Sequence, residues 1–168
     1  MSQLLKAEVL VFQEGEVAPQ VAALRKRIDP IVGNPRLQYK IGVLYAKYGL
    51  FARAEAEFLK LTSDEKTAFV PALINLGNLY FLREDHAGAV KLYAQAARKD
   101  PADVSAQLGL ARASYALGKY NEARAAMASV RKADPQLADR FAFMEKSADG
   151  TARAADFAAL KGVTVWDE

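Results

Sequence analysis

The chain has 168 residues, of which 52% are hydrophobic and 26% are charged. This composition is typical of a folded globular chain and excludes a disordered one. Cysteine is absent and the single histidine is His86, so the sequence excludes disulfides, thiol nucleophiles and histidine-rich metal sites. We expect no catalytic residues, no cofactor and no bound metal. The formal net charge of +3 is small, and we expect no nucleic-acid partner.

The pattern of apolar residues gives no sign of a membrane segment. No apolar stretch approaches the ~20 residues that a membrane-spanning helix needs. Residues 1–6 do not open a signal peptide, because no basic segment followed by a long apolar run is found there. These observations favour a cytoplasmic location over a periplasmic one, and the sequence leaves the compartment open.

Residues 1–34 are predicted to form a degenerate pair of helices. Gly15 lies 34 residues before Gly49 and marks the expected turn between them. Pro19 suits the first turn of the second helix. Apolar residues at helical spacing form the stripe of that helix: Val17, Val21, Leu24 and Ile28.

Three segments of similar sequence follow, over residues 35–69, 70–103 and 104–137. Each begins 34 or 35 residues after the one before it, so equivalent positions can be compared as columns. One column holds small residues, namely Gly42, Gly77 and Ala111, and a second holds Ala54, Ala89 and Ala123. A third column holds Phe58, Tyr93 and Met127. A constant period with matching columns predicts a tandem repeat.

Each segment has the pattern of two helices joined by a short turn. Apolar residues follow the helical spacing i, i+3, i+4, i+7 in both halves of the second segment. Gly49 and Gly118 stand at the turn in the first and third segments, where a left-handed backbone suits glycine. Asp100-Pro101 and Asp134-Pro135 are predicted to end one helix and begin the next. The small residues of the two columns would let the paired helices approach closely, with large aromatic residues filling the space beside them.

These columns resemble the tetratricopeptide repeat, a helix–turn–helix of 34 residues. The second segment matches nearly throughout, with Leu76-Gly77, Tyr80, Ala89, Tyr93, Ala96 and Pro101. The first departs with Gln38 in the leading apolar column, and the third places Ser114 in the tyrosine column. The resemblance implies an all-α fold, a right-handed αα superhelix (solenoid) of antiparallel helix pairs.

Residues 138–168 are expected to cap the last repeat, so that residues 1–168 form a single domain. Apolar residues at helical spacing predict one helix over residues 136–146 and a second over residues 152–160, and residues 163–168 look extended. Three interpretations are open for Trp166: it docks back onto the last helices, belongs to a short binding motif, or marks the cut edge of a longer protein. Docking or truncation is favoured over a motif, because an apolar end surface needs cover.

The resemblance implies that the first helix of each pair lines a concave groove. Eight residues of these helices lie off the predicted core stripe and form the candidate peptide-binding site: Tyr39, Lys40, Lys47, Asn75, Asn78, Phe81, Arg112 and Tyr115. Asparagine pairs with main-chain amides, cations pair with carboxylates, and aromatic rings receive apolar side chains. Truncating Asn78 and Arg112 is expected to weaken binding without changing the melting temperature.

The sequence therefore predicts a non-enzymatic module that binds a protein or peptide partner, in a bacterial multiprotein assembly. Some members of the family clamp the terminal carboxylates of chaperones with five residues on three first helices, and only Asn75 matches that set. The partner is therefore unidentified. One alternative is a structural scaffold that self-associates through its end repeats, and a less favoured one is an RNA-binding or catalytic role.

Overall fold

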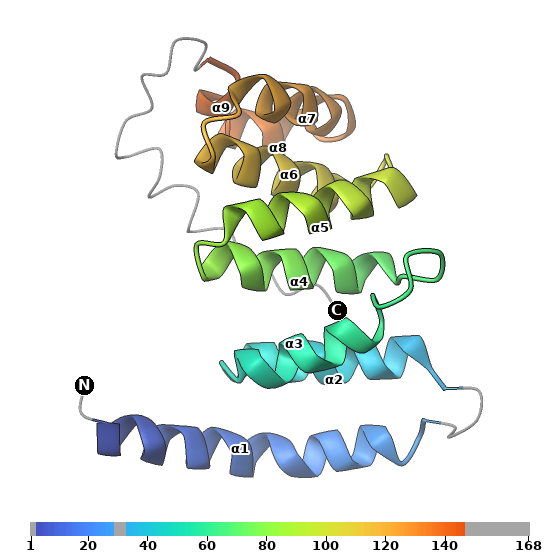
Figure 1. Cartoon of the computed structure of the whole chain (residues 1–168), viewed down its shortest axis with the longest axis vertical. Coiled ribbons are helices and arrows are strands. Elements are labelled where there is room, and N and C mark those ends of the chain that lie inside the picture. Colours follow the sequence, from blue (N-terminus) through green and yellow to red (C-terminus); the bar gives the residue numbers. More distant parts are fainter. Residues whose placement is uncertain (1–2, 29–32, 147–168) are drawn as a thin grey trace. The chain divides into compact units, whose positions relative to one another are not determined.

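The structure is a computed structural model that describes residues 3–28 and 33–146. Within these ranges every regular element is an α-helix and no strand occurs (Figure 1). The all-α fold class predicted from the repeats is therefore confirmed. The helix predicted over residues 152–160, the extended segment over residues 163–168 and Trp166 lie outside the described residues.

The helices belong to two compact units, and the chain passes from one to the other between Asn75 and Leu76, inside helix α4. Unit 1 contains three complete helices and the first part of a fourth: α1 (Gln3–Arg25), α2 (Pro35–Lys47), α3 (Phe51–Lys60) and the start of α4 (Val70–Leu82). Unit 2 contains the rest of α4 and the helices that follow: α5 (His86–Lys99), α6 (Val104–Ala116), α7 (Tyr120–Ala133), α8 (Pro135–Arg140) and α9 (Phe143–Lys146). A single solenoid domain over residues 1–168 stays a prediction.

The N-terminal helical pair predicted within residues 1–34 is wrong, because α1 is one continuous helix. Gly15 and Pro19 both lie inside it, and a Cβ atom at Gly15 would meet nothing within 4 Å. A lone helical glycine costs only about 1 kcal/mol relative to alanine, which is too little to end a helix. Val17 and Val21 are buried in unit 1, and their packing keeps the helix continuous through Gly15 and Pro19.

The first repeat pairs α2 with α3 through the predicted small column. A Cβ atom added to Gly42 would lie 2.4 Å from the ring of Phe58, which is completely buried. Side-chain atoms do not approach one another that closely, so only glycine lets the ring of Phe58 on α3 lie this close to the backbone of α2. The close helix crossing predicted at this column is therefore confirmed.

A polar network explains why Gln38 replaces the apolar residue expected at the start of this repeat. Gln38 donates a hydrogen bond through Nε2 to Oε2 of Glu57, whose side chain is buried. Arg25 of α1 donates to the other carboxylate oxygen at 2.8 Å, and Lys60 lies 2.9 Å from Oε2. A buried carboxylate needs such partners. The network thus joins α1, α2 and α3 in unit 1.

In unit 2 one aromatic ring contacts two glycines. The ring of Tyr93 on α5 lies 2.8 Å from a Cβ position built on Gly77 of α4 and 2.4 Å from one built on Gly109 of α6. Tyr93 is 1% exposed. The second helix of this repeat therefore packs between the first helix of its own repeat and the first helix of the next.

The turns within the repeats share one backbone conformation. Gly49 and Gly118 have φ angles of 72° and 73°, which confirms the left-handed position predicted for them. The second repeat places Glu84 in the same position, with φ 65°, and it is the one residue other than glycine with a positive φ in the described part of the chain. An L-residue is strained there by about 1–2 kcal/mol.

The two Asp-Pro pairs behave differently. Asp134 accepts a hydrogen bond from the backbone N–H of Leu137 at 2.9 Å, and α8 begins at Pro135, as predicted. After Asp100-Pro101, however, the next helix begins only at Val104, where Asp103 provides the cap by accepting from the N–H of Ala106. Aspartate is a strongly preferred capping residue, so a second aspartate sets the start of this helix in place of the proline turn.

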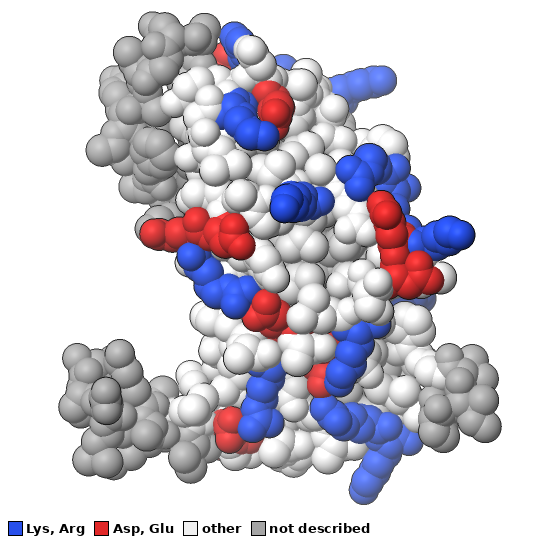
Figure 2. All heavy atoms as spheres, in the orientation of Figure 1, with Lys and Arg blue, Asp and Glu red and all other residues white. Residues whose placement is uncertain are grey.

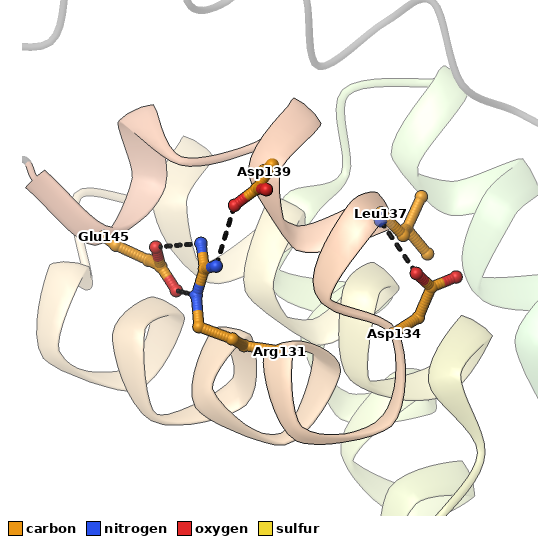
Figure 3. A network of polar contacts seen from close by, with 5 residues as sticks. All are labelled: Arg131, Asp134, Leu137, Asp139 and Glu145. Atoms are coloured by element: carbon orange, nitrogen blue, oxygen red, sulfur yellow. Dashed lines mark hydrogen bonds and ion pairs between the residues drawn. The ribbon is translucent and has the colours of Figure 1, made fainter.

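The C-terminal helix predicted over residues 136–146 is two short helices, α8 and α9. Arg131 of α7 joins both: its guanidinium donates two hydrogen bonds to the carboxylate of Glu145, at 2.8 and 2.7 Å, and one to Asp139 at 2.8 Å (Figure 3). These contacts raise the pKa of Arg131 further above its ordinary value. Phe141 and Met144 are buried, and together with this network they hold the last helices against α7.

Candidate binding surface of the first helices

The eight predicted site residues are divided between the units and differ in exposure. Lys40 and Lys47, both in unit 1, are exposed. The other six are buried: Tyr39 and Asn75 in unit 1, and Asn78, Phe81, Arg112 and Tyr115 in unit 2. The position of a residue on a helix gives the direction in which its side chain points. The structure shows that most of these side chains are buried by other residues.

In unit 1, Tyr39 and Asn75 contact each other. Asn75 donates a hydrogen bond through Nδ2 to the hydroxyl of Tyr39 at 2.9 Å. The Tyr39 ring packs on Phe58 and Phe69, with centroid distances of 5.9 and 5.4 Å. The pair thus supplies a hydrogen bond within a cluster of aromatic rings.

In unit 2, Asn78 and Arg112 are both held by aromatic side chains. Asn78 accepts a hydrogen bond from the hydroxyl of Tyr93 at 2.6 Å. The Arg112 guanidinium lies 4.7 Å from the centroid of the Phe81 ring, which is a cation–π arrangement. Burial lowers the pKa of Arg112 and raises that of Tyr93 well above its ordinary value. An aromatic face compensates for part of the hydration that Arg112 loses.

Tyr115 belongs to the core of unit 2. Its ring is completely buried and makes edge-on contacts with Tyr120 of α7 and Phe143 of α9, at centroid distances of 5.2 and 5.5 Å. The side chain therefore joins three helices of this unit.

The two exposed members of the set line a cleft between α1 and α2 with a volume of about 400 Å³. Its other lining residues come from both helices: Gln20, Ala23 and Leu24 from α1, and Val43 and Leu44 from α2. The sequence did not predict the α1 side of this cleft, because Leu24 was expected on the core stripe of a second helix, and Gln20 and Ala23 were assigned no role.

Sequence reasoning also missed Glu57 and Ser114 as buried polar residues. Gln38 could have pointed to Glu57, because a polar residue in a column of apolar residues needs a buried polar partner. Ser114 stands where the family pattern asks for tyrosine, and its hydroxyl has no hydrogen-bond partner among the described residues.

The charge on the visible face is mixed. Figure 2 shows basic and acidic side chains interspersed, without one continuous basic field. Among the described residues, no group of three or more His, Cys, Asp or Glu side chains is placed to hold a metal ion. No described helix is both long enough and apolar enough to cross a bilayer.

Comparison with known proteins gives a family match and a fold match. The tetratricopeptide repeat family model matches residues 80–146. A solved structure of MamA AMB-1 has 19% identity and a TM-score of 0.61, over 83% of this chain and 85% of that one. MamA MSR-1 has 16% identity and a TM-score of 0.56, over 92% and 91%. A structure of a MamA mutant has 18% identity and a TM-score of 0.58, over 92% of each chain.

At these identities the similarity to MamA shows the fold alone, and no curated protein matches the chain. The family match begins at the end of α4 and includes α5, α6, α7, α8 and α9. The fold match extends the same architecture over most of the remaining residues. Residues 80–146 therefore match the tetratricopeptide repeat family, and most of the chain has a helical fold similar to that of MamA.

Proposed function

We propose that this protein is an interaction module that binds a peptide segment of another protein through its first helices. The candidate residues in unit 1 are Tyr39, Lys40, Lys47 and Asn75, and those in unit 2 are Asn78, Phe81, Arg112 and Tyr115. No catalytic step is part of the proposal.

One observation carries the proposal. Five residues in the described ranges are polar or charged and buried, and four of them come from first helices: Asn75, Asn78, Arg112 and Ser114. A helix whose only task is packing buries mostly apolar residues, and a buried amide or guanidinium costs free energy in so far as its partners do not replace its hydration. Polar groups retained at such a cost are expected where a protein recognises a ligand.

The accessible lysines would make the first contact with an acidic segment. Lys40 and Lys47 are exposed, and the buried amides of Asn75 and Asn78 are reached only after the contacts that cover them open. We therefore expect affinity to depend on the two lysines and association to be slower than a preformed surface would allow.

The experiment selects linear peptides from a random displayed library on the whole chain and measures their dissociation constants by fluorescence polarisation. Replacing both Lys40 and Lys47 with alanine is expected to weaken the selected peptides about tenfold, because each exposed ion pair contributes up to about 1 kcal/mol. The matched control is Lys91→Ala with Arg98→Ala, two exposed cations of α5, and it is expected to change affinity less than twofold.

Two outcomes would contradict the proposal. Failure to select any peptide would remove the binding function. Loss of binding in the α5 control, with none in the Lys40 and Lys47 variant, would place the functional surface on the second helices instead.

A further inference from the structure

We propose that the cleft between α1 and α2 receives one additional α-helix, supplied by a partner protein and carrying an apolar stripe bordered by acidic residues. The inference rests on the proposed protein-binding function and assigns to it a class of partner. Its site differs from the row of first-helix residues because part of it comes from α1.

The arrangement of α1 suggests why a helix fits here. In unit 2 the second helix α5 packs between two first helices, with Tyr93 against Gly77 of α4 and Gly109 of α6. In unit 1, α1 packs beside α2, as the second helix of a preceding repeat would do, and its residues Val17 and Val21 are buried. If α1 corresponds to the second helix of a preceding repeat, that repeat also needs a first helix to pair with α1. No described helix of unit 1 supplies it.

The cleft lies where such a helix would contact both neighbours. Ala23 and Leu24 of α1 face it from one side, and Val43 and Leu44 of α2 from the other. Ala23 is exposed, Leu24 and Leu44 are half-buried and Val43 is buried, so part of the apolar surface is open to a ligand. The cleft has a volume of about 400 Å³.

The charge at the borders specifies the partner. Lys40 and Lys47 both line the cleft, and they are seven residues apart, which is two helical turns or about 10.5 Å along α2. Gln20 is the remaining polar residue of the lining, and no acidic residue contributes. A partner helix with Asp or Glu seven residues apart, beside leucines at i, i+3 and i+7, matches both the spacing and the sign of the charge.

The probe is a synthetic helical peptide of about 18 residues, roughly 27 Å long, with one stripe of leucines and glutamates along the borders of that stripe, labelled with fluorescein. A second peptide carries lysine in place of every glutamate. We expect fluorescence anisotropy to show binding of the acidic peptide, and binding of the basic peptide at least tenfold weaker.

Charge reversal tests the role of the two lysines. Lys40→Glu with Lys47→Glu is expected to invert the preference, so that the basic peptide binds more tightly than the acidic one. The matched control, Lys91→Glu with Lys132→Glu, makes the same change of net charge with exposed lysines of unit 2 and is expected to keep the original order. An inverted order in the control would show a general charge effect and overturn the inference.

Filling the cleft tests its apolar part. Ala23→Trp adds a large ring at an exposed position of α1, and we expect it to weaken both peptides more than tenfold. Circular dichroism and the melting temperature of the variant check that α1 stays folded. Unchanged peptide binding in the folded variant would overturn the inference.

Two further outcomes separate this inference from its foundation. If the helical probes fail while library-selected peptides bind, the interaction function stands and the helix site is wrong; if both fail, both are wrong. If the protein instead forms a dimer in sedimentation experiments that Ala23→Trp abolishes, a second copy occupies the cleft, and the partner helix is overturned.

Discussion

The hydroxyl of Tyr93 donates a hydrogen bond of 2.6 Å to Oδ1 of Asn78, and both side chains are buried. Asn78 is one of the residues that the sequence predicts for peptide binding. In the structure Asn78 accepts the hydrogen bond of the Tyr93 hydroxyl, and the Tyr93 ring lies between two glycines. The first prediction therefore concerns the stability of the fold.

Tyr93→Phe keeps the ring and removes the hydrogen bond. We expect the free energy of unfolding at neutral pH to fall by about 1 kcal/mol, the usual worth of such a bond. Urea unfolding at pH 7 measures it. Phe58 makes the equivalent contact with Gly42 without any hydroxyl, so the phenylalanine variant is expected to fold normally.

The parent and the Tyr93→Phe variant are also expected to differ in how their stability falls at alkaline pH. Burial raises the pKa of Tyr93 above its ordinary value, so the folded protein keeps a proton that the unfolded chain releases above about pH 10. The stabilisation is complete below that pH and is lost as the pH rises beyond it. Urea unfolding between about pH 8 and pH 11 should therefore show a steeper decline for the parent than for Tyr93→Phe, and parallel declines would contradict the burial of the phenol.

Gly77→Leu is expected to lower stability by about 3 kcal/mol, at the upper end of overpacking effects. Even a Cβ atom at this position would lie 2.8 Å from the Tyr93 ring. Gly15→Ala is the control, because a Cβ atom there meets nothing and alanine favours a helix by about 1 kcal/mol. Thermal melts should shift in opposite directions, and a Gly77→Leu variant as stable as the parent would refute the close crossing.

Glu84→Gly is expected to raise stability by about 1 kcal/mol, because it relieves the strain of a positive φ angle. The reverse change, Gly118→Ala, introduces that strain in the next repeat and is expected to destabilise by a similar amount. Chemical denaturation of the two variants tests this, and a stabilised Gly118→Ala would show that the turns are not equivalent.

The burial of Asn78 and Arg112 changes the outcome expected when both are truncated to alanine. Asn78→Ala leaves the Tyr93 hydroxyl without its acceptor, and Arg112→Ala removes the contact with Phe81. We expect a combined loss of about 3 kcal/mol, which lowers the melting temperature by roughly 6–12 °C for a chain of this size. An unchanged melting temperature, as the sequence alone suggests, would mean that these side chains are exposed in solution.

The repeat columns predict the helix pairs correctly because they encode contacts. Gly42 and Gly77 are required by the rings of Phe58 and Tyr93, so their period carries three-dimensional information. The continuity of α1 could not be predicted, since Gly15 and a nearby proline are local signals for a break, whereas packing of the apolar stripe decides the result.

The candidate site was predicted with less success than the fold. The direction of a helical side chain follows from sequence spacing, but its burial depends on neighbours from distant parts of the chain. Arg112 is placed on the predicted helix, yet its guanidinium lies over Phe81. Lys40 and Lys47, with their long hydrated side chains, are exposed as charged residues usually are.

The position of Tyr93 between Gly77 and Gly109 has a consequence for folding. In a linear array, each repeat has its own stability and a coupling to its neighbour. The Tyr93 side chain packs against both the second and the third repeat. Much of the free energy that it contributes therefore belongs to the coupling between these two repeats. These two repeats are expected to unfold as one cooperative block, and a fragment that ends between Lys99 and Val104 would lose the surface that completes its own core.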